Sequence, residues 1–160
     1  MLFIDASVIV AILADEADEA DGETLLDRLE ADGGPFLVSA VSRFEAVLAI
    51  GGRMSRARSA EGPMSPDDIE TARQIVDEFV SEMEATEVRI SGDITEKAID
   101  AASRFGKVVG HPARLNMGDC FAYACARGHR ARLAFKGDDF PHTDMGWDSN
   151  GSSLPSRRRP

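Results

Sequence analysis

The sequence is poor in cysteine and in long apolar runs. Only two cysteines occur in its 160 residues, Cys120 and Cys125, and their spacing matches neither a zinc-binding pair nor a redox CxxC motif. We therefore expect two reduced thiols, as is usual in the cytoplasm. No apolar stretch approaches the roughly 20 residues that span a bilayer. The apolar run at the N-terminus has no basic residue before it and contains Asp5, so neither a targeting segment nor a membrane partner is predicted.

Positive charge is also scarce. The chain has 18 Lys and Arg against 28 Asp and Glu, a formal net charge of -10. It therefore lacks the basic character that usually marks a nucleic-acid-binding protein. Part of the acidity is local, since the stretch from Asp15 to Glu30 holds eight carboxylates and one arginine. We interpret this stretch as a solvent-exposed helix face.

The length and the overall composition are those of an ordinary globular domain. Hydrophobic residues make up 43% of the chain and charged residues 29%, which argues against wholesale disorder. A chain of this length can bury one substantial core. We expect one domain over residues 1–148, and a disordered tail over 149–160 because this segment has no apolar pattern.

Short apolar runs alternate with segments of helical periodicity. The runs at 2–4, 36–38, 86–90 and 131–135 predict buried strands. Helices are predicted from about residue 6 to 13, up to Gly33, around Phe44, after Ser65, over 93–105, and from near Asp119 to Gly128. Residues 51–66 are rich in Gly, Ser, Arg and Pro and predict a frayed helix end and a mobile loop.

This alternation predicts a three-layer α/β/α fold with a mainly parallel central sheet. Ligands of such sheets bind beyond the carboxyl ends of the strands. Asp5 follows the first predicted strand, and Asp138 and Asp139 follow the fourth. We therefore expect these carboxylates at the same edge of the sheet.

Two further acids stand in unusual places. Glu45 lies between apolar residues on a predicted helix, and Asp119 opens a helix of small and apolar residues. Each acid also has an ordinary interpretation: helix N-caps for Asp5 and Asp119, a solvent-facing side chain for Glu45, and a turn for Asp138 and Asp139. Taken together, these acids are predicted to converge at one end of the sheet.

Clustered carboxylates repel one another, by roughly 1 kcal/mol per pair at about 4 Å even in water. A hard divalent cation removes this penalty. Mg²⁺ or Mn²⁺ suits a site made only of carboxylates better than zinc does. His111, His129 and His142 show no spacing typical of a metal site or a catalytic triad, so we assign them no role.

Other polar residues have two open interpretations. Ser7, two residues after Asp5, either hydrogen-bonds the acidic cluster or caps the first helix. Four arginines either contact phosphate or form a solvated face; they are Arg43, Arg53, Arg56 and Arg58.

Four sequence blocks resemble the PIN domain and, within it, the VapC toxins of toxin–antitoxin pairs. The resemblance extends from Met1 to about Met145, and the blocks are Phe3 to Ser7, Ser39 to Ala46, Leu115 to Ala124 and Leu133 to Phe140. It implies a metal-binding and catalytic acidic set of Asp5, Glu45 and Asp119, with Asp139 as the fourth member. Asp138 stands beside Asp139, and either carboxylate suits this fourth position.

The resemblance also implies a function. It predicts an endoribonuclease dependent on Mg²⁺ or Mn²⁺ that blocks translation, a VapB-like antitoxin as its partner, and a homodimer. An alternative keeps the PIN fold but not the catalysis, so that the chain only binds RNA or a partner. A phosphatase with an aspartyl nucleophile is disfavoured, because Ser7 stands where the second acid of such an enzyme is needed.

Overall fold

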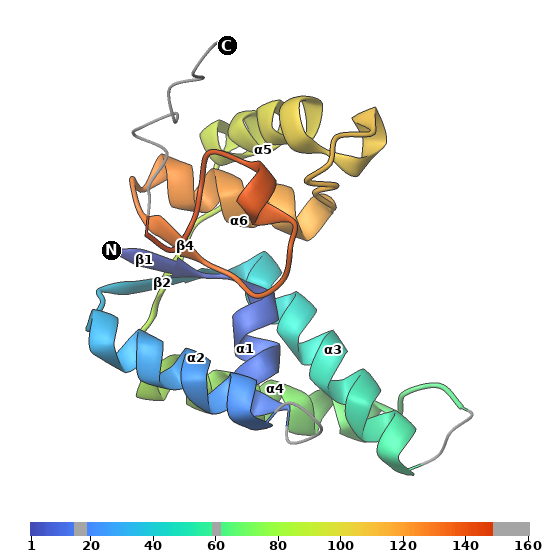
Figure 1. Ribbon diagram of the computed structural model, residues 1–160. Helices are drawn as coiled ribbons and strands as arrows, with labels where there is room; N and C mark the ends of the chain where they lie inside the picture. Colours follow the sequence, from blue (N-terminus) through green and yellow to red (C-terminus); the bar gives the residue numbers. More distant parts are fainter. Residues whose placement is uncertain (15–18, 59–61, 149–160) are drawn as a thin grey trace.

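The computed structural model describes residues 1–14, 19–58 and 62–148, and its architecture is shown in Figure 1. Strands and helices alternate along most of the chain. The strands are β1 (Leu2–Ile4), β2 (Phe36–Ser39), β3 (Thr86–Val88) and β4 (Arg132–Ala134). The helices are α1 (Ala6–Leu13), α2 (Glu19–Asp32), α3 (Ala40–Arg58), α4 (Pro66–Glu82), α5 (Gly92–Phe105) and α6 (Met117–Gly128), with short 3-10 helices η1 (Lys107–Val109) and η2 (Phe140–His142).

The strands form a four-stranded sheet in the order β3-β2-β1-β4. Every neighbouring pair is parallel. Strands β1 and β2 are central and buried along their whole length, as expected for a parallel sheet covered on both faces. The predicted sheet is therefore confirmed. Its strands β3 and β4 are shorter than the apolar runs over 86–90 and 131–135 suggest.

Side chains on the two faces of the sheet enter two separate cores. On β1, Phe3 packs with α5 and α6, whereas Leu2 and Ile4 pack with residues of α1 to α4. Figure 1 shows the same division, with α5 and α6 on one side of the sheet and α1 to α4 on the other. The molecule thus has the three layers predicted from the sequence.

Helix α3 continues well into the segment predicted as a loop. Residues 51–58 are helical, so the prediction of a mobile loop from residue 51 is wrong for these residues. A Cβ at Gly51 would lie 3.2 Å from Sδ of Met64, which shows how closely the chain packs against α3 here. At the end of α3, Arg58 pairs with the buried carboxylate of Asp68 on α4. Tertiary contacts of this kind override the weak helix propensity of glycine.

Helix α6 also begins earlier than predicted. Its N-cap is Asn116, and Asp119 is the third helical residue of a capping box rather than the cap itself. The Oδ2 atom of Asp119 accepts the backbone N–H of Asn116 at 2.8 Å, and Oδ1 of Asn116 accepts the N–H of Asp119 at 3.0 Å. This reciprocal pair of bonds fixes the first turn of α6.

Some sequence predictions lie outside the described residues. The tail over 149–160 and the first part of the acidic run, residues 15–18, are among them. Cys120 and Cys125 are both free and buried. None of the helices in the described ranges is both long and apolar enough to cross a membrane.

Candidate functional site

Asp5 lies where β1 ends and α1 begins. Its backbone N–H donates to the carbonyl oxygen of Ala134 at 3.0 Å, which places it beside the end of β4. Its side chain caps α1 by accepting the backbone N–H of Ser7 at 2.9 Å. Only 4% of Asp5 is exposed. The capping role is therefore real, but it leaves a buried carboxylate at the carboxyl edge of the sheet.

Ser7 does not cap the first helix, because Asp5 does. Instead the Ser7 hydroxyl donates to Oδ2 of Asp5 at 2.5 Å and accepts the backbone N–H of Lys136 at 2.9 Å. Lys136 follows β4, so this hydroxyl connects the segments after the two neighbouring strands. Of the two interpretations left open by the sequence, the structure supports contact with the acidic cluster.

Glu45 reaches the same region from α3. It is partly buried, and its carboxylate lies against Gly118, the residue before Asp119. A Cβ built on Gly118 would lie 2.0 Å from Oε1 of Glu45. Glu45 and the first turn of α6 are thus in direct contact.

The electrostatics connect four carboxylates. Burial, followed by the charges of Asp5 and Asp119, raises the pKa of Glu45 to about 7. Burial also raises the pKa of Asp119 to about 6; the N–H of Asn116 opposes this rise, while Asp5 and Asp139 add to it. The pKa of Asp5 is raised by burial and by Asp139, against its hydrogen bonds from Ser7 and Ala6. These acids therefore lie close enough to repel one another.

Asp139 and Asp138 differ in their effect on the other acids. Asp139, an exposed residue after β4, acts on both Asp5 and Asp119. Asp138 is absent from the charges that act on Asp5, Glu45 and Asp119. The charge of Asp139 thus reaches two of the three other acids, which favours Asp139 over Asp138 as the fourth member.

The donor chemistry of this cluster fits a hard divalent cation. All of its side-chain donors are carboxylate oxygens, and the pKa values of Glu45 and Asp119 are raised first by burial and then by the charges of neighbouring acids. Within the described ranges, however, no group of three or more His, Cys, Asp or Glu side chains is arranged to hold a metal ion. Carboxylate oxygens are nevertheless the donors that Mg²⁺ prefers, and this ion keeps several waters and binds proteins through only one or two carboxylates.

Several residues considered in the sequence lie in other environments. Arg43 forms ion pairs with Asp77 and Glu87, and Arg58 forms its pair with Asp68, so a role of these two arginines in phosphate contact is not supported. Arg53 and Arg56 are exposed on α3. Nδ1 of His111 accepts the backbone N–H of Ala113 at 3.1 Å, which is an ordinary structural role.

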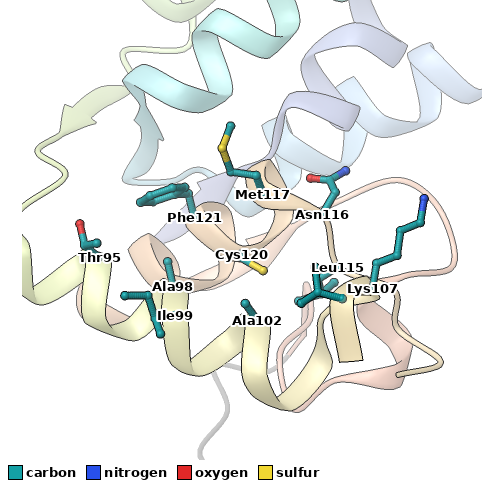
Figure 2. A pocket seen from close by; sticks show the side chains of 11 residues that line it. Thr95, Ala98, Ile99, Ala102, Lys107, Leu115, Asn116, Met117, Cys120 and Phe121 are labelled. Atoms are coloured by element: carbon teal, nitrogen blue, oxygen red, sulfur yellow. The ribbon is translucent and has the colours of Figure 1, made fainter. Parts of the chain in front are cut away.

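An apolar groove was not predicted from the sequence. It has a volume of about 610 Å³ and lies between α5, η1 and the start of α6. Figure 2 shows its lining, which includes Ile99, Leu115, Met117 and Phe121. Exposed apolar side chains stand at its edge, with Val108 85% and Met117 69% exposed. Apolar periodicity predicts buried helix faces and gives no signal for an apolar side chain left in solvent.

The PIN domain family model matches residues 2–145 of the chain. The chain therefore belongs to the PIN domain family, and several VapC proteins are similar to it over nearly their whole length. VapC ribonuclease R02377 of Rhizobium meliloti is 45% identical over 147 residues, which is 91% of this chain and 100% of that protein. In Mycobacterium tuberculosis, ribonuclease VapC30 is 35% identical (90% of this chain, 95% of that protein), and ribonuclease VapC42 is 31% identical (90% and 96%). The resemblance to VapC-type PIN proteins is confirmed.

Proposed function

We propose that the chain is an endoribonuclease that depends on Mg²⁺ or Mn²⁺ and acts as the toxin of a VapBC-type pair. The observation that carries this proposal is the position of Asp5, Glu45, Asp119 and Asp139 in one region: the Glu45 carboxylate lies against the turn that holds Asp119, and the charge of Asp139 acts on Asp5 and Asp119. These acids come from four separate segments, and costly carboxylate clusters are typical of sites for cations. The similarity to proteins named VapC ribonucleases supports RNA as the substrate.

Asp5, Glu45, Asp119 and Asp139 are the residues that would hold the ion. When bound, Mg²⁺ or Mn²⁺ would activate water and stabilise the charge that develops on a phosphodiester. Asp5 is buried and tightly hydrogen-bonded, which keeps one carboxylate in a defined position. Asp139 is exposed and can adjust to the ion or to the RNA. The capping box of α6 holds Asp119 in a fixed helical turn.

The acidic chain needs a cation for a further reason. RNA binding is dominated by phosphate contacts, and a net charge of -10 opposes the approach of a polyanion. An ion at the carboxylate cluster would reverse the local sign of the charge where the phosphate must lie. The metal site is thus proposed to contribute to substrate binding as well as to bond cleavage.

The proposed partners follow from the toxin assignment. A VapB-like antitoxin is expected to inhibit the enzyme, and cleavage of RNA by the free toxin is expected to block translation in the cytoplasm. The two free, buried cysteines are consistent with a reducing compartment.

We further propose that the chain forms a homodimer through the apolar groove. Val108 lines this groove although it is 85% exposed, and Val109, which is 56% exposed, follows it in η1. A two-fold interface requires one surface that complements itself, and an open apolar groove with an exposed valine in its lining offers such a surface. An area of exposed apolar side chains of this kind is typical of protein interfaces.

The nuclease proposal is tested with the purified chain and a single-stranded RNA. We expect cleavage with Mn²⁺, no cleavage with a chelator, and neither cleavage nor calorimetric Mn²⁺ binding for Asp5→Asn. Asn at this position still accepts the N–H of Ser7, so α1 keeps its cap. Equal Mn²⁺ binding by wild type and Asp5→Asn would contradict the proposal. RNA binding without cleavage would instead favour a PIN-fold binding protein.

A further inference from the structure

Gly118 occupies a position where its backbone does not require glycine. It is the second residue of α6, and its φ lies outside the left-handed region in which other glycines of this chain are found. Within a helix, alanine is more favourable than glycine. The reason for a glycine at this position must therefore be sought in tertiary contacts.

The contact that excludes a side chain at Gly118 is the carboxylate of Glu45. A Cβ there would lie 2.0 Å from Oε1, 2.1 Å from Oε2 and 2.3 Å from Cδ of Glu45. These distances are far below van der Waals contact. The carboxylate thus fills the space that any larger residue at 118 would occupy, and the charge of Asp119, the next residue, acts on it.

Another glycine of the same helix meets an apolar side chain instead of a charged one. A Cβ at Gly128 would lie 2.4 Å from Cδ1 of Ile94 on α5, so Gly128 allows close helix packing. The clash at Gly118 involves only the far end of a flexible side chain, which can rotate away without moving the backbone. A substitution at Gly118 should therefore displace a functional group and leave the fold intact.

We infer that Gly118 is a positioning residue, whose missing side chain allows the Glu45 carboxylate to lie beside Asp119 in the metal site. The inference rests on the proposed function for its catalytic consequence. Its structural part, the placement of Glu45, is independent of what the site does.

The test uses Gly118→Ala, with Gly92→Ala as a matched control. Gly92 also lies in the first turn of a helix, α5, but a Cβ there meets no atom within 4 Å. We expect Gly118→Ala to keep the wild-type thermal stability and to lose Mn²⁺ affinity and RNA cleavage by about 10- to 100-fold, the usual effect of disturbing the support of a metal ligand. Gly92→Ala should match the wild type in Mn²⁺ affinity and RNA cleavage and should be no less stable.

The same substitution in a Glu45→Ala variant tests whether Gly118 acts through Glu45. In Glu45→Ala, the further change Gly118→Ala should alter Mn²⁺ affinity by less than about twofold, because the group on which Gly118 acts is gone. An equally large loss in both backgrounds would show that Gly118 acts through Asp119 or through the helix, and would overturn the inference. Unchanged affinity and cleavage in Gly118→Ala alone would also overturn it.

A crystal structure of Gly118→Ala without metal separates this inference from the nuclease proposal. The Glu45 carboxylate should have rotated away from α6, while the backbone of α6 remains in place. If the wild type neither binds Mn²⁺ nor cleaves RNA, the proposed function fails, but this structure still decides the role of Gly118. A carboxylate found unmoved beside Ala at 118 would overturn the inference.

Discussion

The hydroxyl of Ser7 joins the carboxylate of Asp5 to the backbone N–H of Lys136. The first bond fixes Oδ2 of Asp5, and the second holds the segment after β4 that continues to Asp139. One small side chain thus sets the relative position of two of the four acids.

Ser7→Ala should reduce RNA cleavage by about 10- to 100-fold, the usual effect of losing a hydrogen bond that orients a metal ligand. The variant also removes the hydrogen bond that the N–H of Lys136 donates to the Ser7 hydroxyl, which should lower the free energy of unfolding by about 1 kcal/mol. Single-turnover cleavage and urea unfolding measure the two effects. Ser7→Thr keeps the hydroxyl and serves as the control; cleavage by Ser7→Ala at the rate of this control would contradict the role assigned to the bond.

Asp119→Asn should abolish cleavage while preserving the fold. The substitution removes the charge at nearly constant shape, and an Asn side-chain oxygen can still accept the N–H of Asn116 in the capping box. The loss should be at least about 100-fold, the upper end of what even outer-shell changes cost at metal sites. Circular dichroism and thermal unfolding provide the control. Retained cleavage in a folded variant would exclude Asp119 from the site.

Asp139→Asn and Asp138→Asn form a matched pair on neighbouring residues. Of these two residues, Asp139 is the one whose charge adds to the rise that burial causes in the pKa values of Asp5 and Asp119. Asp139→Asn should therefore weaken Mn²⁺ binding in calorimetry, by about tenfold or more if it is a ligand, whereas Asp138→Asn should bind like the wild type. The reverse order of affinities would assign the fourth position to Asp138.

The pH dependence of stability tests the environment of Glu45. Burial raises the pKa of Glu45 from its ordinary value of 4.5 to about 7. Between these values the native protein holds a proton that the unfolded chain has released, so this group makes the free energy of unfolding fall as the pH rises. Metal-free Glu45→Gln lacks this titration. It should gain stability relative to the wild type, by about 1 kcal/mol after allowance for solvent screening, when the pH is raised from about 5 to about 8.

At the higher pH, Mn²⁺ should make the wild type more stable than Glu45→Gln. An ion that binds only the native state stabilises it, and the wild type offers the carboxylate that the variant lacks. Urea unfolding of both proteins over this pH range, with and without Mn²⁺, measures the pH dependence of stability and the effect of the ion. A constant difference between wild type and Glu45→Gln across the pH range would show that the pKa of Glu45 is not raised.

Val108→Asp should prevent dimer formation without unfolding the chain. Val108 is 85% exposed, so it contributes little to either core, while a charge at the edge of an apolar interface must be desolvated on association. Light scattering coupled to size-exclusion chromatography measures the oligomeric state. Ser103→Asp, on the exposed surface of α5, is the control. A wild-type chain that is monomeric at all concentrations would exclude the proposed homodimer.

Much of the fold follows from local patterns. The apolar runs that became β1 and β2 are continuous and sharply bounded, and a buried parallel strand is the simplest structure for such a run. Alternation with helical segments then determines a parallel sheet with helices on both faces. The end of α3 was missed because the packing of Gly51 and the ion pair of Arg58 with Asp68 join residues whose local sequence favours a loop.

Local sequence was enough to identify the candidate acids. Asp5 and the pair Asp138 and Asp139 directly follow predicted strands, and Glu45 and Asp119 stand in unusual places on predicted helices. The three-dimensional structure was needed to show that, of this pair, Asp139 acts on Asp5 and Asp119. It also decided that Asp5 is both a helix cap and a member of the cluster, and that Gly118 makes room for Glu45. The reason is physical: repulsion between charges and overlap between atoms depend on distances of a few ångströms across separate elements, which no local pattern contains.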